Sequence, residues 1–294
     1  MKAFLAAILV VLVATTAQAD TLVVGLFTPS APFPSTAARV ELANKLGEHL
    51  GKALNESGSG RNYARAGDYQ AAVKKGDISV ALVDATYLAV AGGSYTILAG
   101  ATRGGDTSHQ WQLVARGGAA NITALKGKRI LVPSIGGRES DFVINALFSG
   151  DVAKDFFGKI EPAPDTASTL AALGLGKADA AVVPVGVTLP QGTTSVVTLP
   201  ALPGEVLVAY GSVTAQQRQA LAAAAASFSG DASIGGFKAV DADTVKSVSR
   251  RFSVPVKRGP HVVPNVRLVV GDLVDGRTFT IERTPITQYA APAK

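Results

Sequence analysis

The chain has 294 residues, a formal net charge of +6 and no cysteine. The lack of cysteine excludes a disulfide framework, thiolate chemistry and a lipid anchor on cysteine. The basic residues are scattered in pairs such as Lys74-Lys75 and Arg250-Arg251 rather than gathered along one stripe. We therefore expect no nucleic-acid binding.

The first residues have the pattern of a secretory signal peptide. Lys2 supplies a positive start, residues 4–13 form an apolar run too short to span a bilayer, and "AQA" at 17–19 is a small-residue cleavage motif. We expect cleavage after Ala19 and a periplasmic protein that begins at Asp20 and is not a lipoprotein. No other stretch approaches membrane-spanning length.

Strand and helix signals then alternate along the chain. In the first block we expect strands at 21–27, 78–84 and 95–101 and helices at 36–54, 68–75 and 86–91. A proline-rich turn follows the first strand, and "ESGSG" at 56–60 ends the first helix.

The second block continues the alternation. We expect strands at 110–116, 129–133, 179–184 and 205–210 and helices at 139–148, 166–175, from Thr214 and at 241–252, with an irregular stretch at 153–160. Apolar strands without polar alternation, separated by helices, are typical of mostly parallel sheets covered on both faces. The sequence therefore predicts an α/β fold with two lobes. Beyond them, residues 267–283 read as a hairpin with Asp275-Gly276 at its turn.

Catalytic and metal signatures are missing from the sequence. It contains no GxSxG, SxxK, HExxH or P-loop motif. Its three histidines, His49, His109 and His261, are far apart, and His109 lies near the expected boundary between the lobes. We therefore expect no enzyme, no catalytic residues, no metal site and no cofactor.

Three stretches carry a resemblance to a known family. They are "TLVVGLFTPSAPFPSTAARVELANKLGEHLGKAL", "DYQAAVKKGDISVALVDATYLA" and "LKGKRILVPSIGGRESDFVINALF", the last followed by "FFGKI" and "TASTLAALGLGKADAAVVP". In order and spacing they resemble periplasmic solute-binding proteins of the phosphate, phosphite and phosphonate ABC-transporter type, over residues 20–252.

The resemblance implies a two-lobed type II periplasmic binding fold, the Venus flytrap. Lobe 1 would comprise residues 20–105 plus 200–252, lobe 2 residues 106–199, and residues 253–294 would form a C-terminal extension with the hairpin. A small polar ligand, with phosphorus oxyanions among the candidates, would lie between the lobes at the carboxyl ends of strands. Lobe closure would present it to an ABC permease at the inner membrane, and the protein would be a monomer.

An alternative interpretation keeps the fold but not the transport. The chain would then be a sensor input or a protein-interaction module with a degenerate pocket. The acidic residues of "VPSIGGRESD" at 132–141 and the C-terminal extension, which has no counterpart in the family, motivate it.

In the first lobe the ligand-binding candidates follow the strands. Thr28 and Ser30 lie in the first loop, Tyr69 matches the tyrosine that the family keeps at this helix start, and Tyr87 follows the strand at 78–84. Each could instead stiffen a turn or pack a helix. Asp84 ends that strand, where a carboxylate could recognise an amino group or cap the following helix, and we favour the cap.

In the second lobe the candidates lie in "VPSIGGRESD". They are Ser134, Arg138 and Ser140. Phosphonate binders of the family place a run of small hydroxyl residues at this helix start, and here only Ser140 keeps the hydroxyl. Arg138 could pair with an oxyanion bidentately. Glu139 and Asp141 oppose an anion there by repulsion, unless both acids point outward and stabilise the helix start.

Overall fold

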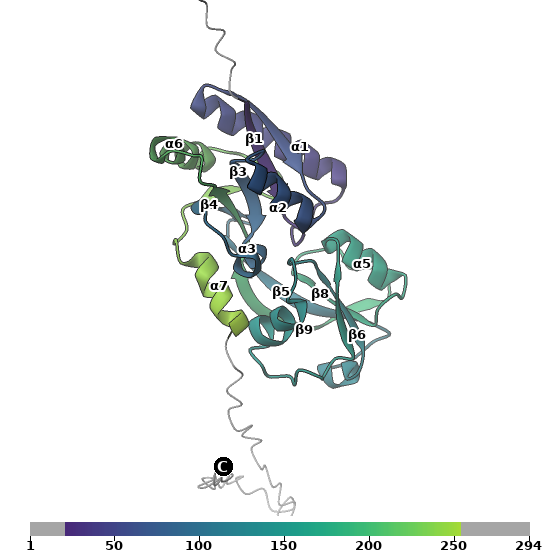
Figure 1. Cartoon of the computed structure of the whole chain (residues 1–294). Coiled ribbons are helices and arrows are strands. Elements are labelled where there is room, and N and C mark those ends of the chain that lie inside the picture. The colour runs from purple at the N-terminus through teal and green to yellow at the C-terminus, as the bar shows by residue number, and fades with distance from the viewer. Residues whose placement is uncertain (1–20, 254–294) are drawn as a thin grey trace, which may run out of the picture. The chain divides into compact units, whose positions relative to one another are not determined.

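The computed structural model describes residues 21–253, which form two β-sheets with helices packed against them (Figure 1). The expected signal peptide and C-terminal hairpin lie outside the described residues. No helix within residues 21–253 is both long enough and apolar enough to cross a membrane.

The first sheet has six strands in the order β11-β4-β10-β3-β1-β2. They are β1 (Thr21–Phe27), β2 (Ser57–Asn62), β3 (Val80–Asp84), β4 (Thr96–Thr102), β10 (Glu205–Ala209) and β11 (Gly236–Lys238). Its helices are α1 (Thr36–Leu54), α2 (Ala66–Lys75), α3 (Ala85–Ala91) and α6 (Ala215–Ala226). Apolar side chains of α1 and α6 pack on one face of the sheet, and those of α2 and α3 pack on the other.

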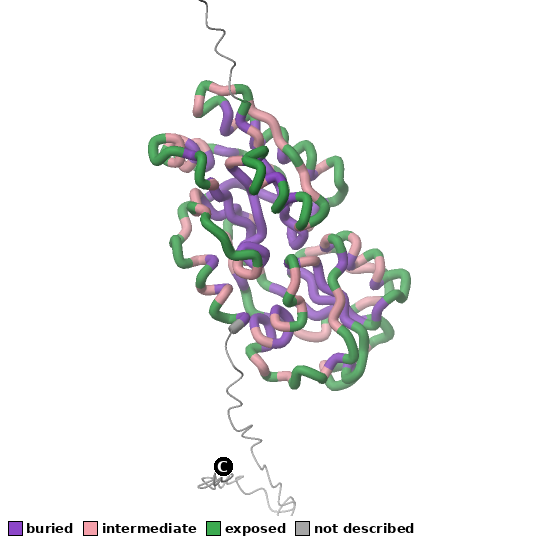
Figure 2. The backbone as a smooth tube through the Cα atoms, in the orientation of Figure 1, coloured by how far each residue is buried: buried purple, intermediate pink, exposed green. Residues whose placement is uncertain are grey.

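The second sheet has five strands in the order β7-β6-β8-β5-β9. They are β5 (Ser108–Arg116), β6 (Arg129–Pro133), β7 (Lys159–Ala163), β8 (Ala180–Pro184) and β9 (Thr193–Pro203). Its helical segments are a 3-10 turn (Ile122–Leu125), α4 (Glu139–Asp141), a π-helical segment (Phe142–Leu147) and α5 (Thr166–Gly174). Figure 2 shows that the inner strands of both sheets are mostly buried, whereas the helices carry both buried and exposed residues.

Two chain crossovers join the sheets. Residues 103–107 connect β4 to β5, and Gly204 alone separates β9 from β10. The Gly204 N–H donates to the Thr107 carbonyl at 2.9 Å, so the two crossovers are bonded to each other. The last described helix, α7 (Thr244–Ser253), contributes Val245 to the apolar cluster beside the first sheet and Val248 and Phe252 to the core of the second.

The α/β fold with two sheets is as expected, but both sheets are mixed rather than mostly parallel. In the first sheet β1 pairs parallel with β2 and β3, whereas β10 pairs antiparallel with β3 and β4. In the second, β6 pairs parallel with β7 and β8, whereas β5 pairs antiparallel with β8 and β9. The crossovers explain the mixed pairing. β5 and β10 each enter a sheet directly from a crossover, at the edge that faces the other sheet, and therefore run antiparallel to the strands beside them.

Most expected elements are found within a few residues of their predicted bounds, and α1 and β1 have the predicted bounds. Four strands were not predicted: β2, β7, β9 and β11. The helix predicted at 139–148 is a single turn, α4, that continues as the wider π-helical segment. These misses fall where apolar periodicity is weak or the chain is rich in glycine.

The missed strand β2 is held by direct backbone contact with α1. A Cβ atom on Gly58 would lie 1.9 Å from the Gly47 carbonyl oxygen, and one on Gly60 would lie 2.0 Å from the Ala43 carbonyl carbon. Both distances are impossible for a real side chain, so only glycine lets the strand lie this close to the helix. The sequence alone predicts that "ESGSG" only ends the first helix. Its glycines instead form part of an edge strand, because they allow close packing against α1.

Gly60→Ala should destabilise the protein by about 1–3 kcal/mol or more, because the new methyl group must push α1 away from β2. Gly67→Ala is the matched control, since a Cβ on Gly67, in α2, meets no atom within 4 Å. We expect this control to stabilise by about 0.4–1 kcal/mol. Urea unfolding of the two variants measures both; equal effects would contradict the packing argument.

Candidate ligand-binding site

The candidate site forms where the neighbouring parallel strands β1 and β3 end. Phe27 pairs with Val83, so the next residues, Thr28 and Asp84, lie side by side at the carboxyl edge of the sheet. The Ser30 N–H donates to Asp84 Oδ2 at 2.8 Å and fixes the first loop over the end of β3. The structure thus brings together three of the predicted residues, Thr28, Ser30 and Asp84, and Ser30 does so through its backbone.

Three side-chain oxygens at this edge are buried without a hydrogen-bond partner in the protein. They are Thr28 Oγ1, Asp84 Oδ1 and Thr86 Oγ1, and their residues are 3%, 1% and 2% exposed. Proteins pair the large majority of their buried polar groups, so such atoms require an explanation. Three of them on two adjacent segments make this edge the candidate site.

Asp84 does not cap the following helix. It occupies the position before α3, but its side chain makes no hydrogen bond to the first turn of that helix. The carboxylate accepts instead from Ser30, which comes from a loop 54 residues away in sequence. The favoured capping interpretation is therefore wrong, since Oδ2 accepts from Ser30 and Oδ1 accepts from no N–H of the helix.

A second buried carboxylate, Glu205, lies opposite Asp84 in the antiparallel pair of β10 and β3. It is fully buried and holds two partners: Arg103 Nη2 at 2.8 Å from Oε1 and His109 Nε2 at 3.0 Å from Oε2. Arg103 follows β4, His109 lies in β5 and Glu205 begins β10, so the cluster sits at both crossovers.

These neighbours drive the pKa values of the two carboxyls apart. Burial and the negative charge of Glu205 raise the pKa of Asp84 to about 8, against hydrogen bonding from Ser30 and the charge of Arg103. Burial would also raise the pKa of Glu205, but the hydrogen bond from His109 and the charge of Arg103 hold it below its usual range. Glu205 is thus the ionised member of the pair, and Asp84 carries a proton at neutral pH.

The predicted tyrosines form an aromatic group behind the site. Tyr69 stacks on Phe27 with ring centroids 5.3 Å apart, and its hydroxyl is hydrogen-bonded to that of Tyr210. Burial, reinforced by Tyr210, raises the pKa of Tyr69 far above its usual range. The Tyr69 hydroxyl therefore already has a partner within the protein.

Tyr87 lies where the two sheets meet. Its ring contacts Phe27 edge-on, with centroids 4.7 Å apart. A Cβ on Gly136 would lie 2.7 Å from the Tyr87 ring, so the backbone of the second-sheet loop passes directly over that ring. Tyr87 is buried, its hydroxyl has no hydrogen-bond partner among the described residues, and burial raises the pKa of that hydroxyl.

The loop at 134–141 binds one of its own acids. Glu139 Oε1 accepts the N–H of Gly137 at 3.1 Å and that of Ile135 at 3.4 Å. Both donors belong to the loop before α4, which begins at Glu139. The interpretation that both acids point outward is wrong for Glu139, which folds back because the free N–H groups are the nearest donors.

The other predicted residues of this loop have different partners. Arg138, in the left-handed region with φ 62°, donates from Nε to Asp141 at 2.9 Å and from Nη2 to the Phe252 carbonyl at 3.2 Å. Ser134 Oγ accepts weakly from Gly136 N–H at 3.4 Å, and Ser140 is exposed. None of the described hydrogen bonds joins this set to Asp84.

The helix α5, which packs beside β6 and β8, holds the first loop from the second sheet (Figure 1). Thr166 donates from Oγ1 to the Ser30 carbonyl at 2.8 Å and from its N–H to the Pro29 carbonyl at 2.9 Å. Beside it, Asp165 pairs with Arg39 of α1 at 2.8 Å. Thr166, Arg103 and Glu205 were not predicted as site residues. The only feature of the sequence that could have indicated them is that each lies at or near the end of a strand.

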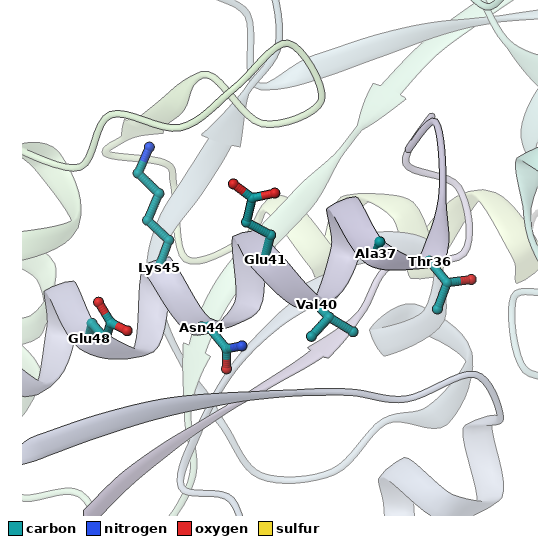
Figure 3. A pocket seen from close by; sticks show the side chains of 7 residues that line it. All are labelled: Thr36, Ala37, Val40, Glu41, Asn44, Lys45 and Glu48. Carbon is teal, nitrogen blue, oxygen red and sulfur yellow. The ribbon is translucent and has the colours of Figure 1, made fainter.

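A separate depression of about 640 Å³ runs along the outer face of α1 (Figure 3). Its lining is Thr36, Ala37, Val40, Glu41, Asn44, Lys45 and Glu48. All of these side chains are exposed on a single helix, so they lack the enclosure that ligand sites provide. Among residues 21–253, no three His, Asp or Glu side chains gather in a way that could hold a metal ion.

Comparison with known proteins identifies the fold. No family model and no curated protein sequence matches the chain. Among solved structures, a Xanthomonas citri protein bound to ATP matches with TM-score 0.61 and 11% identity, over 79% of this chain and 97% of its own. PhnD1 from Prochlorococcus marinus in complex with methylphosphonate matches with TM-score 0.61 and 13% identity, over 79% and 96%.

A third match is a binding-protein component of a phosphonate ABC transporter from Pseudomonas aeruginosa, with TM-score 0.61 and 12% identity over 79% of this chain and 87% of its own. The chain has the type II periplasmic binding fold. In an open α/β sheet, ligands bind beyond the carboxyl ends of the strands. In this periplasmic binding fold, that is where Thr28, Asp84 and Thr86 lie.

Asp84→Asn should stabilise the protein at neutral and alkaline pH. The pKa of Asp84 is raised from 3.8 to about 8 on folding, so its contribution to stability is fully present below pH about 4, is lost as the pH rises and is gone above about 8. We expect the melting temperature of the wild type to fall between about pH 6 and 8 and that of the variant to fall less. Thermal unfolding across this range measures the difference.

Glu205→Gln is the matched comparison, because it removes the charge from the opposite strand position. It leaves Arg103 and His109 without their carboxylate and should destabilise by about 3–5 kcal/mol. A stabilising Glu205→Gln, or a destabilising Asp84→Asn, would contradict the division of charge described above.

Proposed function

We propose that the chain is the substrate-binding component of an ABC-type importer, which captures a small polar solute between two lobes and passes it to a permease. The main support for this proposal is a set of three buried oxygens without hydrogen-bond partners. They belong to Thr28, Asp84 and Thr86, at the carboxyl ends of β1 and β3. The fold supports the same conclusion, because two of the matching structures are PhnD1 with methylphosphonate and a phosphonate-transporter component.

The proposed mechanism uses the two crossovers as a hinge. Lobe 1 would comprise residues 20–105 and 200–252, and lobe 2 residues 106–199. The contacts of Thr166 with Pro29 and Ser30 and of Asp165 with Arg39 are those that closure would make. A solute held at Asp84 would lie beside the loop that these contacts secure, so its binding would favour the closed arrangement.

The proposal places the protein in the periplasm, exported by the leader at 1–19, as a monomer whose partner is the inner-membrane permease. Phosphorus oxyanions belong to the proposed solutes, because methylphosphonate is bound in the matching PhnD1 structure. The protein binds and releases its solute without chemical conversion, as the binding-protein role requires.

The second candidate function is a sensor input or a protein-interaction module. One observation favours it: the loop at 134–141 fills its backbone donors with Glu139 and lies on the Tyr87 ring. Protein groups there occupy positions that a ligand-binding loop would leave open.

A thermal-shift screen of the purified protein against a broad library of metabolites separates the two functions. A solute present at 100 times its dissociation constant stabilises the folded protein by about 2.7 kcal/mol, which is a readily measured rise in melting temperature. We expect at least one small polar solute to do so. Silence across the whole library would exclude the importer function and favour the second candidate.

Thr28→Val tests where the solute binds, because it removes a buried hydroxyl and keeps the shape of the side chain. We expect it to weaken binding of the solute found in the screen by about tenfold. Glu41→Ala, in the depression on α1, is the control and should leave affinity unchanged. The reverse pattern in calorimetric titrations would move the site to α1.

A further inference from the structure

We infer that the solute of this protein carries a protonated amine, which binds at Asp84 with Thr28 and Thr86. This inference rests on the proposed function and adds the class of solute to it.

The charges around the site leave carboxylates, not cations, without an ion pair. Three arginines near the two loops already have a carboxylate: Arg103 has Glu205, Arg39 has Asp165 and Arg138 has Asp141, all within 2.9 Å. The ion pairs of the described residues include neither Asp84 nor Glu139. Arg103 Nη1 has no hydrogen-bond partner, but the charge of Arg103 is balanced by Glu205. An oxyanion would therefore compete with a carboxylate for each of these three arginines.

The acceptors at the site suit an ammonium group. Asp84 Oδ2 already accepts from Ser30, which leaves Oδ1 without a donor. Thr28 Oγ1 and Thr86 Oγ1 are likewise buried and unpartnered, and each hydroxyl oxygen can accept. An ammonium has three N–H donors and no acceptor. The number of open oxygens on these three residues equals the number of its donors.

Ionisation of Asp84 then becomes part of binding. The charged or titratable groups that face Asp84 are Glu205 and Arg103, with His109 bonded to Glu205 and Tyr87 in the next helix turn. In the free protein, burial and Glu205 keep Asp84 protonated at neutral pH. A cation beside Oδ1 favours the carboxylate, so Asp84 loses its proton when the amine binds. An anion would do the opposite and favour the protonated carboxyl.

The test uses three probes with the same two-carbon skeleton: ethanolamine as a cation, ethylene glycol as a neutral molecule and glycolate as an anion. Calorimetry is done at about pH 6, 7 and 8 in two buffers of different ionisation enthalpy. Small primary amines from the library extend the cation arm, and methylphosphonate extends the anion arm.

We expect the amines to bind, with affinity rising by up to about tenfold per pH unit between pH 6 and 8 and with release of a proton. Asp84→Asn should remove this pH dependence and weaken amine binding at least tenfold. Thr86→Val, which keeps the carboxyl, should weaken amine binding several-fold and leave the pH dependence in place. Circular dichroism and the melting temperature check that both variants fold.

Several outcomes would overturn the inference while the importer function stands. One is binding of glycolate or methylphosphonate that weakens as the pH rises. Another is equal binding of ethylene glycol and ethanolamine, and a third is a library solute that binds while every amine is silent. Failure of the whole library, in contrast, removes the proposed function itself.

Discussion

The rest of the site depends on the ion pairs of the buried Glu205 carboxylate. Glu205 begins β10, lies fully buried at the junction of the two sheets and accepts from Arg103 and His109, one residue on each side of the first crossover. A buried carboxylate without such partners would be strongly destabilising. Its ionised state is therefore fixed by the chain connections themselves. The same charge, directly opposite Asp84, is one of the two causes that raise the pKa of Asp84.

The first loop transmits this constraint to the second sheet. Ser30 donates its N–H to Asp84 and accepts from Thr166 through its carbonyl oxygen, so one residue connects the buried carboxyl to α5. A guest that changes the ionisation of Asp84 changes the strength of the Ser30 hydrogen bond, because bonds to an ionised acceptor are the stronger ones. Site chemistry and the contact between the two sheets are thereby linked through a single peptide segment.

The sequence predicts the elements whose burial is periodic and misses those specified by tertiary contact. α1 is predicted from a repeat of apolar residues on one face, of which Ala43, Leu46 and Leu50 are buried whereas Val40 and Ala53 are exposed. β2, in contrast, has no apolar pattern and exists because its glycines fit under α1. At the site, Thr28, Ser30 and Asp84 were predicted because they follow strands. The opposition of Asp84 and Glu205 depends on strand register across 121 residues, and the inward turn of Glu139 depends on a local rotamer, so neither is readable from spacing.

In this molecule the fold does not determine the chemistry of the candidate site. The backbone matches that of phosphonate-transport binding proteins at 12–13% identity, yet function depends on side chains placed on a fold rather than on the fold. In this chain the backbone donors of the second-sheet loop are bonded to Glu139, and a carboxyl with two hydroxyls faces the end of the first sheet. A carboxylate inside the loop repels an anion, and a carboxyl at the opposite edge attracts a cation. Both features act in the same direction, and both support the proposed preference for a cationic solute.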